Sequence, residues 1–346
     1  MRSSLPLSVL DLSPIPAGAS AGEALRNTID LARHAESLGL TRYWLAEHHN
    51  AASLASSSPE IMVGQVAAAT TTLRVGTGGV MLPNHSSLHV AEMFRVLHAL
   101  FPGRIDLGLG RAPGTDARTA AALRRGIRPL SADDFPVQLD ELFDYLEGDA
   151  SPRAAFSPTI TAVPTGVATP DLWILGSSDF GSAVAAERGL GFAFAHQLNQ
   201  HDAIPMLRSY RARFRPSAYR AAPWAILAIS VICADTDARA EELASTVDLA
   251  GVRSAQGLRD LPLPTPREAM AHRYDPDEES LRRLHRERHV VGGVDRVRAT
   301  LRELCAASGA DELMVMTNVH DHAARKRSYE LVRAALDGEG RASLPS

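Results

Sequence analysis

The sequence predicts an α/β protein whose eight parallel strands close into a TIM (β/α)8 barrel. Apolar strand-like runs alternate with helical patterns along the chain, and the strand-like runs number eight. Strands that are almost entirely apolar and separated by helices belong to a parallel sheet covered on both faces. A length of 346 residues suits one such barrel, so we expect a single domain over 1–346 rather than two domains.

The elements follow one another in a regular order. The predicted strands cover 7–12, 43–46, 73–81, 105–110, 172–175, 192–195, 226–233 and 313–317. The predicted helices cover 22–38, 59–71, 88–100, 135–146, 182–188, 203–214, 238–249, 295–307 and 321–336. Residues typical of helix ends support several boundaries, such as Gly39 after the first helix and Ser58 with Pro59 before the second.

Two segments depart from this repeat. Residues 148–170 are rich in Pro, Thr and Ala and predict an extended excursion with a short hairpin. Residues 251–291 contain three closely spaced prolines and a long polar stretch, which is too long for an ordinary loop between a strand and a helix. We predict that 251–291 is an insertion on the C-terminal rim of the barrel, where it forms a lid or pocket wall.

Composition excludes several classes of protein. The net charge of −4, without a run of five like charges, disfavours nucleic-acid and membrane partners. Lys326 is the only lysine among 36 Lys and Arg residues, which disfavours Schiff-base chemistry. The two cysteines are too few for a disulfide framework or an iron–sulfur cluster. The N-terminal residues do not resemble a signal peptide and no run of eighteen apolar residues occurs, so a cytoplasmic protein is expected.

Chemically capable residues follow six of the eight predicted strands. In TIM barrels the active site is assembled at this end of the strands. The candidates are Glu47, His48, His49, Asn50, Gly78, Gly79, Asn84, His85, Arg111, Gly176, Ser177, Ser178, His196, Gln197, Asn318 and His320. Their convergence predicts a site, within which Glu47, Asn84 and His196 are assigned to the substrate pocket.

Each candidate also has a purely structural interpretation. His48 and His49 are adjacent and would point to opposite sides of an extended segment, so we expect one in the pocket, the other packed or capping, and no metal site. Gly78 and Gly79 are compatible with a bulge or with the close approach of a flat ligand.

A phosphate site has two candidate positions. Gly176, Ser177 and Ser178 precede a helix, where they could form an N-cap or bind an anion, and Arg111 could be a surface ion-pair partner or a phosphate ligand. The segment 292–293, two glycines before the helix at 295, is the competing phosphate site that many barrels would favour.

Several motifs are similar to those of the bacterial luciferase-like flavin monooxygenases. They are YWLAEHH at 43–49, VGTGGVMLP at 75–83 and GRIDLGLGR at 103–111, with further similarity at 175–178 and 310–315. Segments 56–59 and 111–116 resemble the alkanal monooxygenase-like branch. The resemblance implies a TIM barrel that uses reduced FMN, supplied by a separate flavin reductase, and molecular oxygen to oxidise a small organic, aldehyde-like or hydrophobic, substrate. It also implies a homodimer.

The resemblance also assigns roles to residues. His48 matches the family's catalytic histidine, and Gly78 with Gly79 matches a non-proline cis peptide held against the flavin. The family's phosphate site is matched by Arg111, Gly176, Ser177 and Ser178. The resemblance therefore favours a phosphate site at these residues over one at 292–293.

The sequence also departs from the family pattern. Gly110 stands where luciferase has a reactive cysteine, and Arg118, Arg124 and Arg125 are all close to the place of a second phosphate-binding arginine. Two alternatives stay open, a deazaflavin-dependent oxidoreductase and a non-catalytic flavin-binding protein.

Overall fold

A closed barrel of parallel strands forms the centre of the computed structural model, which describes residues 5–124, 134–148, 160–258 and 260–337. Its strands are β1 (Leu7–Asp11), β2 (Arg42–Leu45), β3 (Arg74–Thr77) continued by β4 (Val80–Met81), β5 (Ile105–Gly110), β6 (Asp171–Gly176), β7 (Gly191–Ala195), β8 (Ala225–Ala234) and β10 (Glu312–Met316). Strand β10 pairs in parallel with both β1 and β8, which closes the barrel. The predicted TIM barrel is therefore confirmed.

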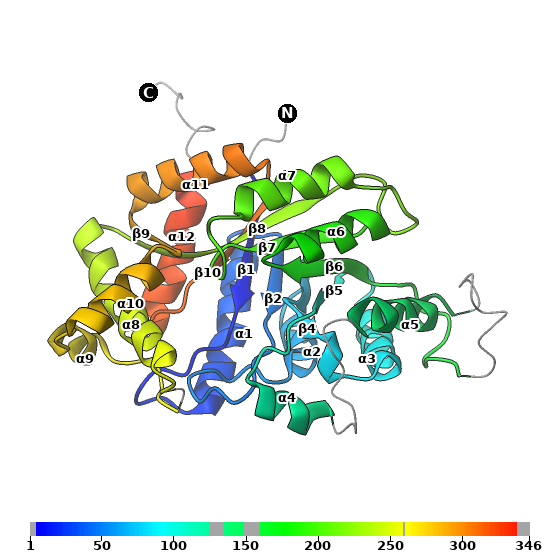
Figure 1. The fold of residues 1–346 in the computed structure, drawn as a ribbon, viewed down its shortest axis with the longest axis horizontal. Coiled ribbons are helices and arrows are strands. Elements are labelled where there is room, and N and C mark those ends of the chain that lie inside the picture. The colour runs from blue at the N-terminus through cyan, green and yellow to red at the C-terminus, as the bar shows by residue number, and fades with distance from the viewer. Residues whose placement is uncertain (1–4, 125–133, 149–159, 259, 338–346) are drawn as a thin grey trace.

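Helices surround the strands (Figure 1). The helices expected from the sequence are α1 (Ala21–Ser37), α2 (Pro59–Ala69), α3 (Ser87–Leu100), α5 (Phe135–Glu147), α6 (Asp179–Arg188), α7 (Ala203–Arg213), α8 (Asp237–Ala255), α11 (Val294–Ser308) and α12 (His322–Asp337). The sequence did not predict the 3-10 helix η1 (Leu82–Asn84), α4 (Ala117–Arg124), α9 (Pro266–Ala271) or α10 (Pro276–Arg286). Within the described ranges, no helix is long and apolar enough to cross a membrane.

The run predicted as one strand over 73–81 is divided into β3 and β4. The division falls at the Gly78–Gly79 peptide bond, which is cis, as the family resemblance implied. A Cβ atom on Gly79 would lie 2.8 Å from the carbonyl oxygen of Gly108, and one on Gly78 would lie 2.6 Å from Cδ1 of Leu10. The barrel wall is therefore packed so closely at this point that neither position has room for a side chain.

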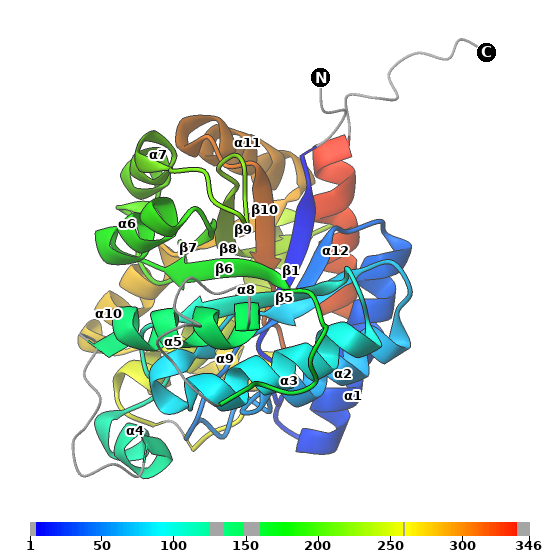
Figure 2. The same ribbon diagram turned by 90° about the vertical axis from the view of Figure 1, so that its right-hand side faces the viewer.

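The segment 251–291 contains more regular structure than the sequence indicated. Helix α8 continues to Ala255, and α9 and α10 are followed by β9 (His289–Gly293), which pairs in parallel with the second half of β8. Because β8 pairs with β10 only as far as Ser230, its remaining residues are free to pair with β9. Helices α4 and α9 lie beyond the C-terminal ends of the strands in Figure 1 and Figure 2.

The hairpin expected within 148–170 is not present in residues 160–170, which contain no strand. The rest of that expectation falls on 149–159, which lie outside the described residues.

A buried charge network fills the N-terminal end of the barrel. Nε and Nη2 of Arg42 donate to the two carboxylate oxygens of Glu312, at 2.7 and 3.0 Å, and its Nη1 donates to Asp106 at 2.8 Å. Both carboxylates are completely buried, and indole nitrogens also donate to them, from Trp44 to Asp106 and from Trp224 to Glu312. Since isolated buried charges are very costly, this pairing fixes how β2, β5 and β10 face one another.

Several interior positions toward the C-terminal end of the barrel hold small side chains. Above the charges, the rings of Trp44 and Trp173 contact each other edge-on with centroids 5.3 Å apart. The next interior positions of β7, β8 and the end of β2 hold Ala193, Ala228 and Ala46. The charges and the two tryptophans therefore fill the base of the barrel, while these alanines leave space among the larger side chains nearer the rim.

We predict that Arg42→Met strongly destabilises the fold. The substitution leaves the buried Glu312 without its cation, while Asp106 keeps its ion pair with Arg74. Removing one partner of a buried ion pair costs about 3–5 kcal/mol of unfolding free energy. Urea denaturation followed by circular dichroism measures this loss. The control Arg239→Met removes an exposed ion pair with Glu242 and should cost less than about 1 kcal/mol. Equal small losses in both variants would contradict the structural importance of the buried network.

Candidate active site

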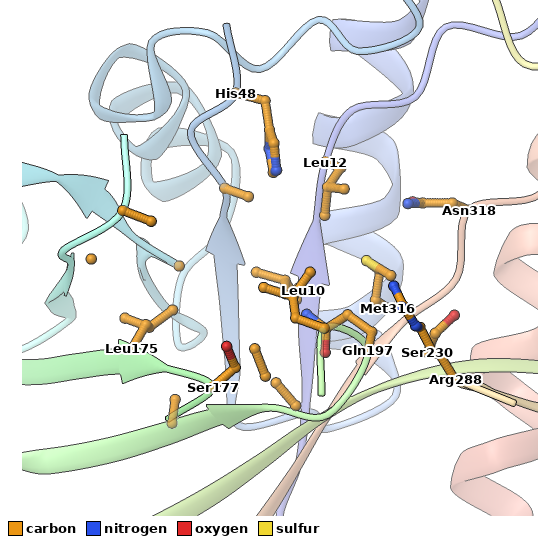
Figure 3. Close-up of a pocket in the computed structure, with 18 of the residues that line it drawn as sticks. Leu10, Leu12, His48, Leu175, Ser177, Gln197, Ser230, Arg288, Met316 and Asn318 are labelled. Atoms are coloured by element: carbon orange, nitrogen blue, oxygen red, sulfur yellow. The ribbon is translucent and has the colours of Figure 1, made fainter. Parts of the chain in front are cut away.

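A cavity of about 550 Å³ opens at the C-terminal ends of the strands. Its inner surface is mostly apolar and includes Leu10, Ala46, Ala193, Ala228 and Met314 from the barrel interior. Figure 3 shows polar side chains, among them His48, Gln197 and Asn318, pointing toward this space from several strand ends. The convergence expected from the sequence therefore forms a pocket of the size that small-molecule sites have.

One side of the cavity has the features of an anion site. Gly176, Ser177 and Ser178 line it directly before α6, and the hydroxyl of Ser178 makes no capping hydrogen bond although the residue occupies the N-cap position. Arg111 also lines the cavity, with its guanidinium 4.0 Å from the ring centroid of Phe180. The helix N-terminus adds free amides and a positive dipole end.

Arg111 has no hydrogen bond or ion pair with any residue that the structure describes. An arginine that stacks on an aromatic ring is held in place while its donors stay free, which suits a phosphate or carboxylate ligand.

The competing glycine pair does not offer a free anion site. The amide of Gly293 donates to Oδ1 of Asp237 at 2.7 Å, so a carboxylate of the protein already occupies that helix N-terminus. Neither Gly292 nor Gly293 is among the residues that line the cavity. The glycine pair 292–293 is therefore a poorer anion site than Gly176–Ser178, which lines the cavity.

The two adjacent histidines separate as expected. His48 points into the cavity (Figure 3), and its buried Nδ1 has no partner among the described residues. His49 turns the other way, where its Nε2 lies 2.8 Å from Oε1 of Glu47. Burial lowers the pKa of His48, so its imidazole is neutral near pH 7 and available for a ligand or a proton.

Glu47 and Asn84, expected in the substrate pocket, are not among the residues that line it. The buried Glu47 carboxylate accepts hydrogen bonds from the amide of Met81 at 2.7 Å and from Asn84 Nδ2 at 3.3 Å, and lies 2.9 Å from Nε2 of His85. These donors draw the carboxylate away from the cavity. Glu47 instead ties the segment that follows Gly79 to the end of β2.

His196 is also absent from the cavity lining, whereas its neighbour Gln197 is part of it. The backbone amide of His196 donates to the carbonyl of Ala228 at 2.9 Å, and burial lowers the pKa of its imidazole to about 4. Gly79 does not line the cavity either, because it packs against Gly108.

Among the described residues, none of the three arginines expected near a second phosphate-binding position lines the cavity. Arg118 is not among the lining residues, while Arg125 and the side chain of Arg124 lie outside the described residues.

Sequence reasoning expected the segment 251–291 to form a lid or pocket wall, but it did not identify the polar side chains on this other side of the cavity. They are Ser230, His285, Arg288 and His289. Ser230 Oγ lies 2.6 Å from Nδ1 of His289. One of these residues could have been found from the sequence. Side chains alternate along a strand, so Ser230 lies on the same inward face of β8 as Ile226 and Ala228.

We predict that Glu47→Gln destabilises the protein most between about pH 4.5 and 6.5. Burial raises the pKa of Glu47, but the hydrogen bonds from His85 and Met81 outweigh it and hold the pKa below its ordinary value of 4.5. Burial lowers the pKa of His85, but Glu47 outweighs it and raises the pKa above 6.5. The stability from Glu47 is lost as pH falls through its lowered pKa, and that from His85 is lost as pH rises through its raised pKa.

Thermal unfolding of both proteins from pH 4 to 9 tests this expectation. A difference in unfolding temperature that does not change with pH would contradict the pairing of Glu47 with His85.

Comparisons with known proteins agree with this geometry. A family model described as luciferase-like monooxygenase matches residues 5–312. A protein of Escherichia coli (strain K12) named luciferase-like monooxygenase is 42% identical over 324 residues, which cover 94% of this chain and 95% of that protein.

Two solved structures are similar to this chain. Apo-MsnO8 has a TM-score of 0.86 at 39% identity, covering 96% of this chain and 98% of that chain. The oxygenating constituent of 3,6-diketocamphane monooxygenase from Pseudomonas putida, in complex with FMN, has a TM-score of 0.69 at 18% identity, covers 99% and 100% of the two chains, and shows a shared fold alone. Because the family match spans most of its length, the chain belongs to the luciferase-like monooxygenase family.

Proposed function

We propose that this protein is an FMN-dependent monooxygenase that uses reduced FMN and molecular oxygen to oxidise a small organic substrate. A separate flavin reductase supplies the reduced cofactor. The observation that carries the proposal is Arg111, which has no ion pair with a described residue, beside the uncapped N-terminus of α6. Nδ1 of His48, which also has no partner among the described residues, lies in the same cavity. The homodimer implied by the resemblance stays a prediction.

The residues present fit a flavin mononucleotide. Arg111, Ser177 and Ser178 would hold the phosphate through charge-assisted hydrogen bonds, while Gly78 and the alanines of the barrel interior leave room for a flat ring. When bound, FMN supplies the activation of oxygen. The chain binds and orients the reactants in a largely apolar cavity.

His48 is placed to move a proton. Burial lowers its pKa, so the imidazole is uncharged near pH 7, and Nδ1 has no partner that competes for a hydrogen bond. The backbone amide of His48 donates to the carbonyl of Ser56 at 3.1 Å, which fixes the segment that carries the ring. We assign His48 the role of acid or base toward groups in the cavity.

We predict that Arg111→Met weakens FMN binding about tenfold to a hundredfold, because a charge-assisted phosphate contact is lost. Quenching of flavin fluorescence during titration of FMN-free protein measures the dissociation constant. Arg188→Met is the control, since Arg188 lies in the last turn of α6 and pairs with Asp140 outside the cavity.

Two results would reject the proposal. One is a wild-type protein that binds neither oxidised nor reduced FMN, and the other is unchanged binding in Arg111→Met. A clear preference for a deazaflavin in a parallel titration would favour the deazaflavin-dependent alternative.

We predict that His48→Gln lowers substrate oxygenation by about 10²- to 10⁴-fold, the usual contribution of a positioned acid or base. FMN affinity should stay within about twofold of the wild-type value. A coupled assay with a flavin reductase and ¹⁸O₂ measures label incorporation by mass spectrometry. Wild-type protein that binds reduced FMN, yet incorporates no label into any substrate class, would favour the non-catalytic alternative.

A further inference from the structure

The cavity contains a second arginine without a protein partner. Arg288 lies between α10 and β9, lines the cavity, and has a buried Nε without a hydrogen bond in the part of the chain that the structure describes. Figure 3 places it beside Ser230 and Met316, on the side of the cavity away from Leu175 and Ser177. Arg288 is therefore separate from the anion site before α6.

The arginines of the preceding helix are different. Nε of Arg282 and Nε of Arg283 pair with the carboxylate of Glu279, at 2.7 and 2.8 Å, and Nε of Arg286 pairs with Asp248 at 2.9 Å. Carboxylates therefore neutralise these three side chains, while no carboxylate in the described part of the chain neutralises Arg288.

The rest of the cavity does not compensate the charge of Arg288. Neither Asp nor Glu occurs among the described residues that line the cavity. Burial lowers the pKa of His285, and burial together with His285 lowers the pKa of His289 to about 3, so both imidazoles beside Arg288 are neutral near pH 7. A partly buried guanidinium without an anion is unfavourable, because it has lost water and gained no partner.

Other residues that line the cavity indicate which further chemical groups a ligand would have. Leu263, Val247 and Met316 provide apolar surface, and the buried side-chain oxygens of Gln197 and Asn318 have no partners among the described residues. A ligand with an apolar body, a hydrogen-bonding group and one anionic end would satisfy these groups together. A guanidinium binds a carboxylate in a bidentate geometry, which makes a carboxylate the best match for that end.

We propose that Arg288 binds the carboxylate of the substrate, so that this enzyme acts on small carboxylic acids with an apolar body. The reaction itself rests on the proposed monooxygenase function, whereas the binding of the carboxylate does not. Arg288 thereby determines which substrates enter the cavity, and it fixes the end of the molecule that lies away from the FMN phosphate site.

Binding of matched head groups tests the proposal without turnover. Protein loaded with oxidised FMN is titrated calorimetrically with sodium octanoate and with octanamide, which share chain length and differ in charge. We expect octanoate to bind at least about tenfold more tightly than octanamide. Arg288→Met should abolish this preference, and Arg288→Lys, which keeps the charge without the bidentate geometry, should retain part of it.

A matched control removes the same charge outside the cavity. Arg283→Met lies on the same segment, and the Arg283 side chain is 75% exposed, so octanoate binding should stay as in the wild type. Circular dichroism shows whether each variant is folded. If Arg288→Met does not fold, the comparison of octanoate with octanamide is made with Arg288→Lys.

Three outcomes would overturn the proposal. They are equal affinities for octanoate and octanamide, an unchanged preference in Arg288→Met, and a loss of FMN affinity in Arg288→Met as large as that in Arg111→Met, which would make Arg288 a cofactor ligand. If the wild type binds no FMN, the proposed function fails, but the same octanoate titration on FMN-free protein still decides the role of Arg288.

Discussion

The ion pairs of Arg42 with Asp106 and Glu312 are the constraint on which the rest of the structure depends. They join β2, β5 and β10, which lie at different points around the barrel, through three charges that have almost no contact with water. Such charges are tolerated only in a geometry that pairs them fully, so the pairing restricts the strands to one arrangement. Because this network and the two tryptophans fill the base, the open space of the barrel lies at the other end.

A second buried carboxylate organises that open end. Glu47 holds the backbone beyond Gly79 through Met81 and Asn84, and it also engages His49, so that His48 is left facing the cavity. Charges that hold the fold are paired within the protein. At the base of the barrel, Asp106 and Glu312 compensate the charge of Arg42. No described carboxylate compensates the two arginines that line the cavity, and this difference distinguishes them from the charges that hold the fold.

Much of the fold could be predicted because each barrel strand is a short apolar run followed by a helix. The approximate position of the site followed from the same count, since polar residues gathered at the strand ends. Strand β9 could not be predicted, because it exists only through pairing with the part of β8 that extends past Ser230. The orientation of Glu47 was also hidden, since alternation no longer determines direction after a strand ends and local hydrogen bonds decide instead.

Arginine supplies nearly all of the basic residues of this chain, and the surroundings of the buried and cavity arginines suggest a physical reason. A guanidinium is always charged and offers a rigid set of donors, so it can be buried against carboxylates, as Arg42 and Arg325 are, or kept ready for an oxyanion. In a cavity without carboxylates, an uncharged ligand covers Arg288 without pairing it and so increases the desolvation cost. Discrimination against neutral molecules therefore arises from a penalty on the wrong ligand as much as from attraction to the right one. The penalty is smaller at Arg111, because the contact of its guanidinium with the Phe180 ring offsets part of the lost hydration.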